Sequence, residues 1–307
     1  MKTTHRSYSE VSGDFNRLCS FITTQGGYLR THSTWCLGRF VDWKYGLYEN
    51  KTAIAGFCDR NAHIWFDAFG DVAGFAISEN GDTGFAILLA EGYRFLFEEM
   101  LGWTLENWSG RGLGFATEVA ERQEREMRLL EQHGFRRGSA FYTQRFDLTR
   151  PLAPRSPLEP GVAIVDMFTH PNYREQRILR DDAFSGNSSL TEEELQRHLE
   201  FYNYIHQGPI YHPQYDLCVM AEDGRFVAGC EALIDARNVE ADIERVCTHS
   251  RFRRRGFARA VIQDCLYRLQ DLGMRNAYLT GYDPEAINLY RSLGAAEERQ
   301  CFVYQRM

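Results

Sequence analysis

The stretch Val246-Cys-Thr-His-Ser-Arg-Phe-Arg-Arg-Arg-Gly-Phe-Ala258 decides the fold class of the second half of this 307-residue chain. It connects a strand-like segment, residues 241–248, to an amphipathic helix expected over residues 256–272. A loop that enters a helix in this way exposes unpaired backbone N–H groups at the positive end of the helix dipole. Gly256 lets the backbone approach a ligand closely, so the stretch predicts a binding site for a diphosphate.

Arginines surround this loop and add positive charge and bidentate donors for phosphate oxygens. They are Arg253, Arg254, Arg255 and Arg259. A solvated basic turn is one alternative, because most charge runs lie on the surface without a ligand. A basic helix that grips nucleic acid is another, but the expected helix must bury an apolar face and the chain is acidic. The order of strand, glycine and helix favours the diphosphate.

Periodicity predicts that this loop belongs to a layered α/β structure. Before the loop, we expect strands over residues 162–167, 215–221 and 226–234, and helices over 171–184 and 191–206. After it, we expect a strand over 276–281, a helix over 284–293 and a final strand. The Asp223-Gly224 turn between two strands predicts antiparallel pairing, whereas the strand–helix–strand passages predict parallel pairing elsewhere. The expected fold class is α/β (α+β), with a mixed, mostly antiparallel sheet flanked by helices.

Arg253-x-x-Gly256-x-Ala258, after a strand that ends in Val246-x-Thr248, resembles the [Gln/Arg]-x-x-Gly-x-[Gly/Ala] motif of the GNAT superfamily, the Gcn5-related N-acetyltransferases. The resemblance continues to Ala286-Ile-Asn-Leu-Tyr-x-x-x-Gly294 and follows the family's last four elements through residues 225–307. It implies that acetyl-CoA is the acyl donor, that the loop holds its pyrophosphate, and that the preceding strand offers backbone partners to the pantetheine and the acyl carbonyl. The implied contact residues are Val246, Cys247, Thr248, Arg253, Arg254, Arg255, Gly256, Phe257, Ala258 and Arg259.

The same resemblance implies a catalytic acid, Tyr290, which in the family protonates the departing coenzyme A thiolate. Tyr290 lies in a segment with Asp283 as a helix N-cap, proline at the first helical position and a glycine stop, so the helix itself is expected from the sequence. The alternative is that Tyr290 packs in the apolar stripe of this helix with its hydroxyl at the rim.

Acyl transfer to an amine also needs a base, and the sequence offers two carboxylates. Strict alternation along residues 241–248 places Glu244 on the same face as Val246 and Thr248, next to the expected acyl group. Glu231 on the neighbouring strand is the alternate base, and a water chain relayed by either glutamate is equally compatible. The plainer interpretation is a strand carboxylate paired with a nearby arginine such as Arg245.

The two halves of the chain resemble each other. Residues 72–82 parallel residues 227–235, and each half has a helix stopped by glycine before an aromatic strand near its end. Four prolines fall within residues 149–160, a spacing typical of an extended linker. We therefore expect a degenerate GNAT-like domain over residues 1–149, a linker over 150–160 and a catalytic GNAT domain over 161–307. This tandem organisation is similar, in architecture alone, to that of mycothiol synthase.

The first half lacks an equivalent of the cradle. At the corresponding place it reads Ala90-Glu-Gly-Tyr-Arg-Phe95, which has no matching motif. The glycines of Ser109-Gly-Arg-Gly-Leu-Gly114 follow a helix-like run and precede a strand-like one, the reverse of what an anion site needs. One active site per chain is therefore expected.

The composition limits the partners and the location. A net charge of −7 argues against sequence-independent binding of nucleic acid, and no segment stays apolar over the length that spans a bilayer. We therefore expect a cytoplasmic protein that binds neither nucleic acid nor membranes. The eight cysteines form no Cys-x-x-Cys pair and the nine histidines show no metal spacing, so we expect neither disulfides nor a metal.

These patterns predict an acetyltransferase that moves an acetyl group from acetyl-CoA to a primary amine of a small molecule or peptide, by direct attack. The acceptor pocket is expected around residues 172–207. Two alternatives stay open: a non-catalytic acyl-CoA sensor with the same cradle, and a scaffold that uses an aromatic surface of the first half. The tryptophans of that half have helix or strand spacing and are expected in the core instead: Trp35, Trp43, Trp65, Trp103 and Trp108.

Overall fold

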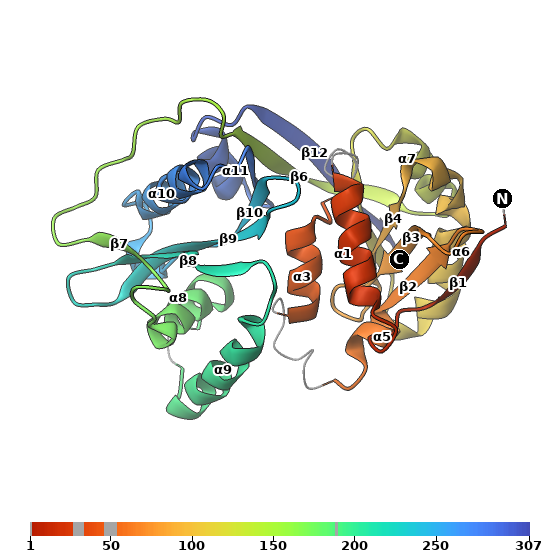
Figure 1. The fold of residues 1–307 in the computed structure, drawn as a ribbon, viewed down its shortest axis with the longest axis horizontal. Coiled ribbons are helices and arrows are strands. Elements are labelled where there is room, and N and C mark those ends of the chain that lie inside the picture. The colour runs from red at the N-terminus through yellow and green to blue at the C-terminus, as the bar shows by residue number, and fades with distance from the viewer. Residues whose placement is uncertain (1, 27–33, 46–53, 188–189) are drawn as a thin grey trace. The chain divides into compact units, whose positions relative to one another are not determined.

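The computed structural model describes residues 2–26, 34–45, 54–187 and 190–307. The chain forms two compact units (Figure 1), which are described separately. The first comprises Met1–Tyr142 and Arg299–Met307, and the second comprises Thr143–Glu298.

The first unit is a sheet with the strand order β1-β2-β3-β4-β5-β12. Parallel pairing joins β4 to β5, and the pairs β1–β2, β2–β3, β3–β4 and β5–β12 are antiparallel. In chain order its elements are β1 (Thr4–Ser7), α1 (Asp14–Thr24), α3 (Leu37–Tyr45), α5 (Phe57–Asn61), β2 (Ala62–Phe66), β3 (Val72–Ile77), β4 (Gly84–Leu89), η1 (Glu91–Leu96), α6 (Phe97–Trp108), η2 (Ser109–Arg111), β5 (Phe115–Ala120), α7 (Glu124–Gln132) and the start of β6 (Arg136–Asp147).

The second unit repeats this plan with the strand order β6-β11-β10-β9-β8-β7. Here β10 and β11 are parallel, while β7–β8, β8–β9 and β9–β10 are antiparallel. Its elements are β7 (Ala163–Asp166), α8 (Tyr173–Ser185), α9 (Glu192–Ile205), β8 (Tyr211–Met220), β9 (Phe226–Asp235), β10 (Glu240–Thr248), η3 (Ser250–Phe252), α10 (Phe257–Asp271), β11 (Asn276–Gly281), α11 (Pro284–Arg291) and β12 (Glu297–Arg306).

Both units therefore contain a mixed, mostly antiparallel sheet with helices, which confirms the expected fold class. The division between the units falls within β6 and within β12, so each of these strands contributes residues to both units. The first unit thus consists of two separate segments of the chain, whereas each expected domain is one continuous segment. The assignment of residues 1–149 and 161–307 to two ancestral domains stays a prediction, supported by the shared succession of elements.

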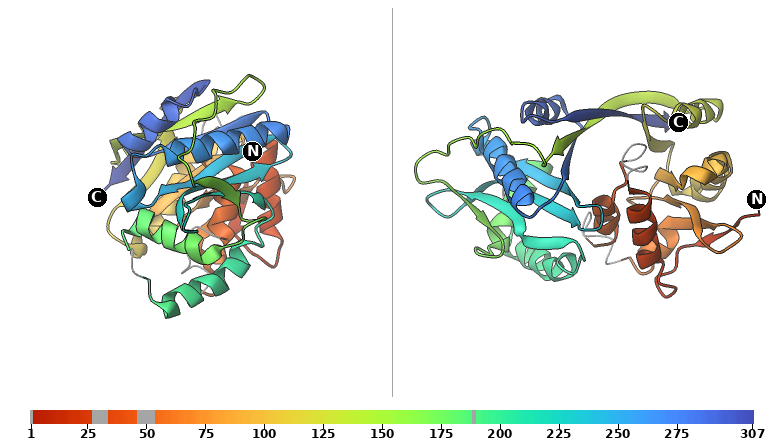
Figure 2. Two further views of the ribbon diagram at one scale, coloured as in Figure 1. Left: turned by 90° about the vertical axis from the view of Figure 1, so that its left-hand side faces the viewer. Right: turned by 45° about the horizontal axis from the view of Figure 1, so that its top comes forward.

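The proline-rich segment lies along α10 inside the second unit (Figure 2). Gln263 accepts a hydrogen bond from the Ser156 backbone N–H at 2.8 Å and donates to the Pro154 carbonyl at 3.0 Å. About two helical turns further along α10, Gln270 donates to the Leu148 carbonyl at 2.7 Å. Proline cannot donate to a sheet, so side chains of the helix bind this extended segment instead. The role of residues 150–160 as a domain linker stays a prediction.

Helices cover both faces of the second unit's sheet. One core cluster joins the sheet to α10 through Ala241, Ile243 and Val261, and Tyr290 belongs to the same cluster. On the other face, Leu179 of α8 packs with Cys247. Figure 1 shows α10 and α8 on opposite sides of β8, β9 and β10. The end of β10 that leads into α10 therefore lies between the core on the α10 side and the core on the α8 side.

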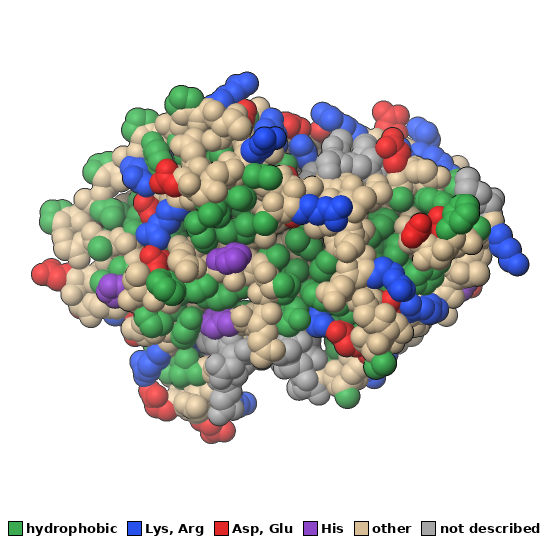
Figure 3. Space-filling view, viewed as in Figure 1, with side chains coloured by type: hydrophobic (Ala, Val, Ile, Leu, Met, Phe, Trp, Pro, Cys, Tyr) green, Lys and Arg blue, Asp and Glu red, His purple; other side chains and the backbone are tan. Residues whose placement is uncertain are grey.

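Four of the five tryptophans expected in the core are buried, and the fifth, Trp103, is partly buried and packs against a core cluster. Trp35, Trp43, Trp65 and Trp108 are at most 3% exposed, which counts against an aromatic scaffold surface. On the face shown in Figure 3, basic and acidic side chains are interspersed among the residues that the structure describes. None of the described helices has the length and apolar character needed to cross a membrane.

Candidate active site

The strands β10 and β11 separate at their carboxyl ends. They pair in parallel from Glu240 opposite Asn276 to Asp242 opposite Tyr278. Beyond this point β10 continues to Thr248 without a described partner on the β11 side. This opening between the two strands lies in the place where open α/β sheets commonly bind an extended ligand.

A β-bulge interrupts β10 beside this opening. Glu244 lies opposite Glu231 of β9, and Cys247 lies opposite Gly229, so two residues of β10 face one residue of β9. The expectation of strict alternation is therefore wrong. Glu244 shares its face with Cys247, on the α8 side of the sheet, whereas Val246 packs against the core on the α10 side.

The loop after β10 has the backbone form of an anion cradle. Arg254 and Gly256 both have positive φ, 66° and 81°, and successive turns of this kind point N–H groups into one concavity. Gly256 is the N-cap of α10, whose first-turn N–H groups have no acceptor within the helix. A Cβ on Gly256 would meet nothing within 4 Å, so the space in front of the loop is open.

The arginines of the loop differ in their contacts. Arg255 forms a bidentate ion pair with Glu159, with 3.1 Å between its Nε and Oε1. Arg259 donates to the Ser292 carbonyl at 3.2 Å and to its hydroxyl at 2.6 Å. The Arg253 guanidinium is 3.5 Å from the Thr248 carbonyl. These three and Arg254 border the loop.

The other expected contact residues would act through their backbones. The Phe257 side chain is 3% exposed and lies in the core, while Ala258 is half-buried in the first turn of α10. Cys247 is buried beneath α8, and its side chain cannot face the loop. Peptide N–H groups are the donors that all of these residues can supply.

Asp182 of α8 holds the start of the loop, and the sequence analysis missed it. Its carboxylate accepts hydrogen bonds from the Ser250 hydroxyl at 2.9 Å and from the Ser250 backbone N–H. Burial acts to raise the pKa of Asp182, but the bonds from Ser250 outweigh it and lower the pKa below its usual value. The partners are 68 residues apart, and no local pattern marks this contact.

Asp182→Ala is expected to lower the free energy of unfolding by about 1–3 kcal/mol, because it leaves the Ser250 donors without an acceptor. Glu192→Ala is the control, since Glu192 is 81% exposed and pairs with Arg174 at the surface, and such a pair contributes only about 0.2–1 kcal/mol. Urea unfolding of both variants measures the difference. Equal destabilisation would contradict the anchoring role of Asp182.

A ladder of buried charges lies behind the bulge. Arg245 donates to Glu231 at 3.0 Å, and Arg180 of α8 donates to Glu231 at 3.1 Å and to Asp216 of β8 at 3.2 Å. Gln176 donates to Asp216 at 2.7 Å. The carboxylates are 1–3% exposed and the two arginines 13–14%, so each charge depends on its partners.

The two carboxylates of this ladder have opposite pKa shifts. Burial raises the pKa of Asp216 to about 6, against the opposing effect of Arg180. Burial acts in the same direction on Glu231, but Arg245 and Arg180 together hold its pKa below the usual value. Glu231 is therefore ionised at neutral pH and tied to two guanidinium groups.

Tyr290 lies in α11 with 5% exposure. Asp283 caps this helix by accepting from the Ala286 N–H at 2.8 Å, and Pro284 occupies the first turn, which confirms the expected helix start. Burial raises the pKa of Tyr290, and the Glu244 carboxylate raises it further. The structure thus brings the expected acid and base within electrostatic reach of each other.

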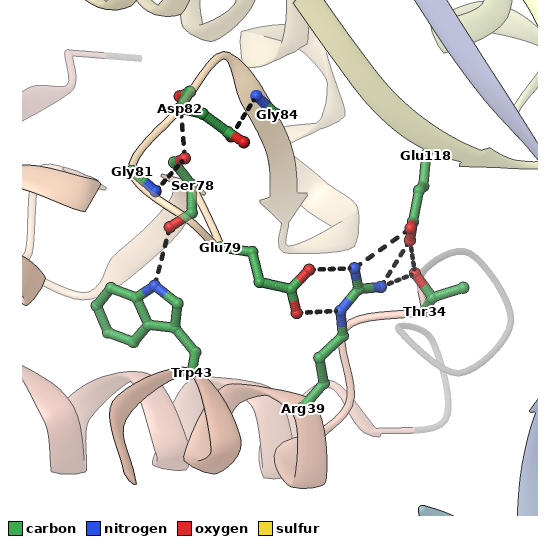
Figure 4. Close-up of polar contacts among 9 residues, drawn as sticks. All are labelled: Thr34, Arg39, Trp43, Ser78, Glu79, Gly81, Asp82, Gly84 and Glu118. Atoms are coloured by element: carbon green, nitrogen blue, oxygen red, sulfur yellow. Dashed lines mark hydrogen bonds and ion pairs between the residues drawn. The ribbon is translucent and has the colours of Figure 1, made fainter. Parts of the chain in front are cut away.

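The corresponding place in the first unit has no glycine-started helix. There, β4 leads through Ala90, with φ of −64°, into η1, and Arg94 of η1 pairs with Glu126 at 2.6 Å. Figure 4 shows a second arginine, Arg39 of α3, between Glu79 and Glu118, which it contacts at 2.8 and 2.6 Å. These charges neutralise one another within the unit.

The expected turn at residues 109–114 is present. It comprises η2 and Gly114, whose φ is 78° and whose Cβ position lies 2.8 Å from the Arg306 carbonyl. A side chain there would clash with the backbone of β12. The glycine spacing that resembles a phosphate loop therefore serves strand packing.

Comparison with known proteins finds one family match, and it lies within the second unit. Residues 180–295 match the model of the acetyltransferase (GNAT) family. No curated protein matches the chain.

Solved structures resemble the whole chain. A GCN5-related N-acetyltransferase from Sphaerobacter thermophilus is 17% identical with a TM-score of 0.66, over 99% of this chain and 95% of that one. A tandem GNAT protein from the clavulanic acid biosynthesis pathway is 10% identical, with a TM-score of 0.64 over 99% and 98% of the two chains. A GNAT-family acetyltransferase from Colwellia psychrerythraea is 13% identical, with a TM-score of 0.57 over 99% of both chains. These likenesses show a shared fold that includes both units.

Proposed function

Because residues 180–295 match the model of the acetyltransferase (GNAT) family, we propose that the protein transfers an acetyl group from acetyl-CoA to a primary amine. The observation that carries the proposal is the opening between β10 and β11, which leads into a helix whose N-cap is Gly256 at φ of 81°. An extended thioester arm fits the first feature, and a diphosphate fits the second. Residues 246–248 and 253–259 are the proposed contacts.

The proposed reaction needs no covalent intermediate with the enzyme. The amine nitrogen attacks the thioester carbonyl, a C–N bond forms, and the C–S bond breaks with the electron pair on sulfur. Burial raises the pKa of Cys247 to about 12, so this thiol near the opening is a poor nucleophile. Direct transfer between the two substrates is consistent with that environment.

Glu244 is the proposed base. It lies at the bulge, on the side of the sheet covered by α8, and is half-buried. The amine loses one proton as the C–N bond forms, and a carboxylate at this position can take it directly or through water. Glu231, the alternate base, is paired with two guanidinium groups, which weaken it as a proton acceptor.

Tyr290 is the proposed donor to the departing sulfur. Its raised pKa keeps the phenol protonated at any working pH, so it can donate a hydrogen bond to the thiolate as negative charge develops. Complete proton transfer from such a phenol is uphill unless the thiolate is equally desolvated. We therefore propose that the Tyr290 hydroxyl accelerates the chemical step and does not contribute to acetyl-CoA binding.

Tyr290→Phe is expected to lower kcat about 100-fold, the lower range for loss of a positioned proton donor, with little change in the Kd for acetyl-CoA. The change removes one oxygen and leaves the ring to pack in the core. Tyr278→Phe, at another tyrosine with 5% exposure in the same unit, is the control. Steady-state rates with calorimetric Kd values measure both, and a Kd loss that equals the kcat loss would contradict the acid role.

The function is tested by free-thiol release from acetyl-CoA in the presence of polyamines, amino acids, aminoglycosides or peptide N-termini. Amine-dependent release that stops on Tyr290→Phe or Glu244→Gln supports the enzyme. Tight binding of acetyl-CoA without release for any amine would instead support an acyl-CoA sensor.

A further inference from the structure

Arg245 has an unusual backbone conformation for a residue with a long side chain. Its φ is 51°, in the left-handed region where a Cβ costs about 1–2 kcal/mol. Such a conformation persists where the surroundings enforce it. The strain lies within the bulge, at the residue directly after Glu244.

Ion pairs of the side chain hold Arg245 in this backbone conformation. The Arg245 guanidinium bonds to Glu231 Oε2 at 3.0 Å, with both side chains almost enclosed. The same oxygen accepts from Arg180 at 3.1 Å, and Arg180 reaches Asp216. Four charges thus connect β10, β9, α8 and β8, and a guanidinium that left this ladder would leave a buried carboxylate with one partner fewer.

We propose that Glu231 is a positioning residue, which holds Arg245 at positive φ and thereby fixes the bulge that aims the β10 backbone at the thioester. The bulge takes residues 245–246 out of register with β9, and the β11 ladder has already ended at Asp242. The directions of the peptide groups in this segment are therefore set by the bulge and not by regular pairing with a neighbouring strand. This inference rests on the proposed function.

Glu231→Gln is the first test. It keeps the shape and an acceptor oxygen but removes the charge that pairs Arg245 and Arg180. We expect kcat to fall about 100-fold, the effect of misplacing one donor to a developing oxyanion, while the Kd for acetyl-CoA changes less than about three-fold because the diphosphate loop is intact.

A second substitution separates positioning from proton transfer. Glycine adopts positive φ without an ion pair, and Arg180 remains as a partner of Glu231. Arg245→Gly alone is therefore expected to keep the bulge and to lose much less kcat than Glu231→Gln. In the double variant, Glu231→Gln with Arg245→Gly, the buried unpaired guanidinium is gone and the bulge is kept. We expect the double variant to recover to the rate of Arg245→Gly.

A double variant as slow as Glu231→Gln would overturn the proposal, because a lost base cannot be rescued by glycine. If Glu231→Gln does not fold, the proposal is tested by comparing the turnover of Arg245→Gly with that of Arg245→Val. Valine is β-branched and more strained than glycine at this φ, so we expect Arg245→Val to lose turnover that Arg245→Gly retains. Equal rates for these two would overturn the proposal as well.

A wild-type protein without acetyl-CoA turnover would remove the proposed function but not the structural part of the inference. Urea unfolding then compares Glu231→Gln with the double variant. The double variant is expected to have the higher midpoint, because the single one keeps Arg245 without its carboxylate. A lower midpoint for the double variant would show that Arg245 does not depend on Glu231.

Discussion

Gly256→Trp is expected to abolish measurable acetyl-CoA binding, with a loss of at least about 100-fold in affinity. Two effects combine. The tryptophan side chain enters the open space in front of the loop, where a Cβ on Gly256 meets nothing within 4 Å. It also strains a backbone with φ of 81°. Two lost N–H bonds to phosphate, each worth about 1.5–3 kcal/mol, account for that loss.

The control for this variant is Gly273→Trp at the other end of α10. Gly273 has φ of 88° and likewise nothing within 4 Å of its Cβ position. Both variants therefore carry a left-handed tryptophan with a similar strain of about 1–2 kcal/mol. Calorimetric titration distinguishes them: only Gly256→Trp loses binding if α10 begins at a diphosphate site. Equal affinities for the two variants would contradict the cradle.

Glu244→Gln is expected to lower kcat by about 100-fold to 1,000-fold near neutral pH, within the range for removal of a general base. The amide of the variant cannot accept the proton that the amine loses as the C–N bond forms. Acetyl-CoA affinity should be unchanged, since the amide keeps the shape of the side chain.

Asp242→Asn provides the matched control, because Asp242 lies on the same face of β10 two residues before Glu244. It is 5% exposed and pairs with β11 before the strands separate. Its kcat should resemble that of the wild type. Equal kcat values for Glu244→Gln and Asp242→Asn would rule out Glu244 as the base.

Much of the second unit followed from residue patterns. The helix expected over residues 256–272 is Phe257–Asp271, and the strand over 276–281 is Asn276–Gly281. Glycine stops, an Asp N-cap and apolar periodicity are local signals, and these elements depend on them. The largest boundary shift is that of β8, which begins at Tyr211 instead of residue 215, because the strand continues through Pro213 across a register shift.

The parts of the site that could not be predicted depend on distant contacts. Arg245 is not a residue type that favours positive φ, and its partner Glu231 is 14 positions away. Alternation was therefore the reasonable expectation, and it placed Glu244 on the wrong face. Asp182 likewise reaches Ser250 from another helix. Both features exist only after the sheet has assembled.

Calorimetric titration of the wild-type protein with acetyl-CoA tests the central claim most directly. One molecule should bind per chain, because the loop before α10 begins its helix at Gly256 while the corresponding place in the first unit has Ala90 and a paired Arg94. No binding would contradict the proposed acyl-CoA site. Two molecules per chain would contradict the assignment of that site to the second unit alone.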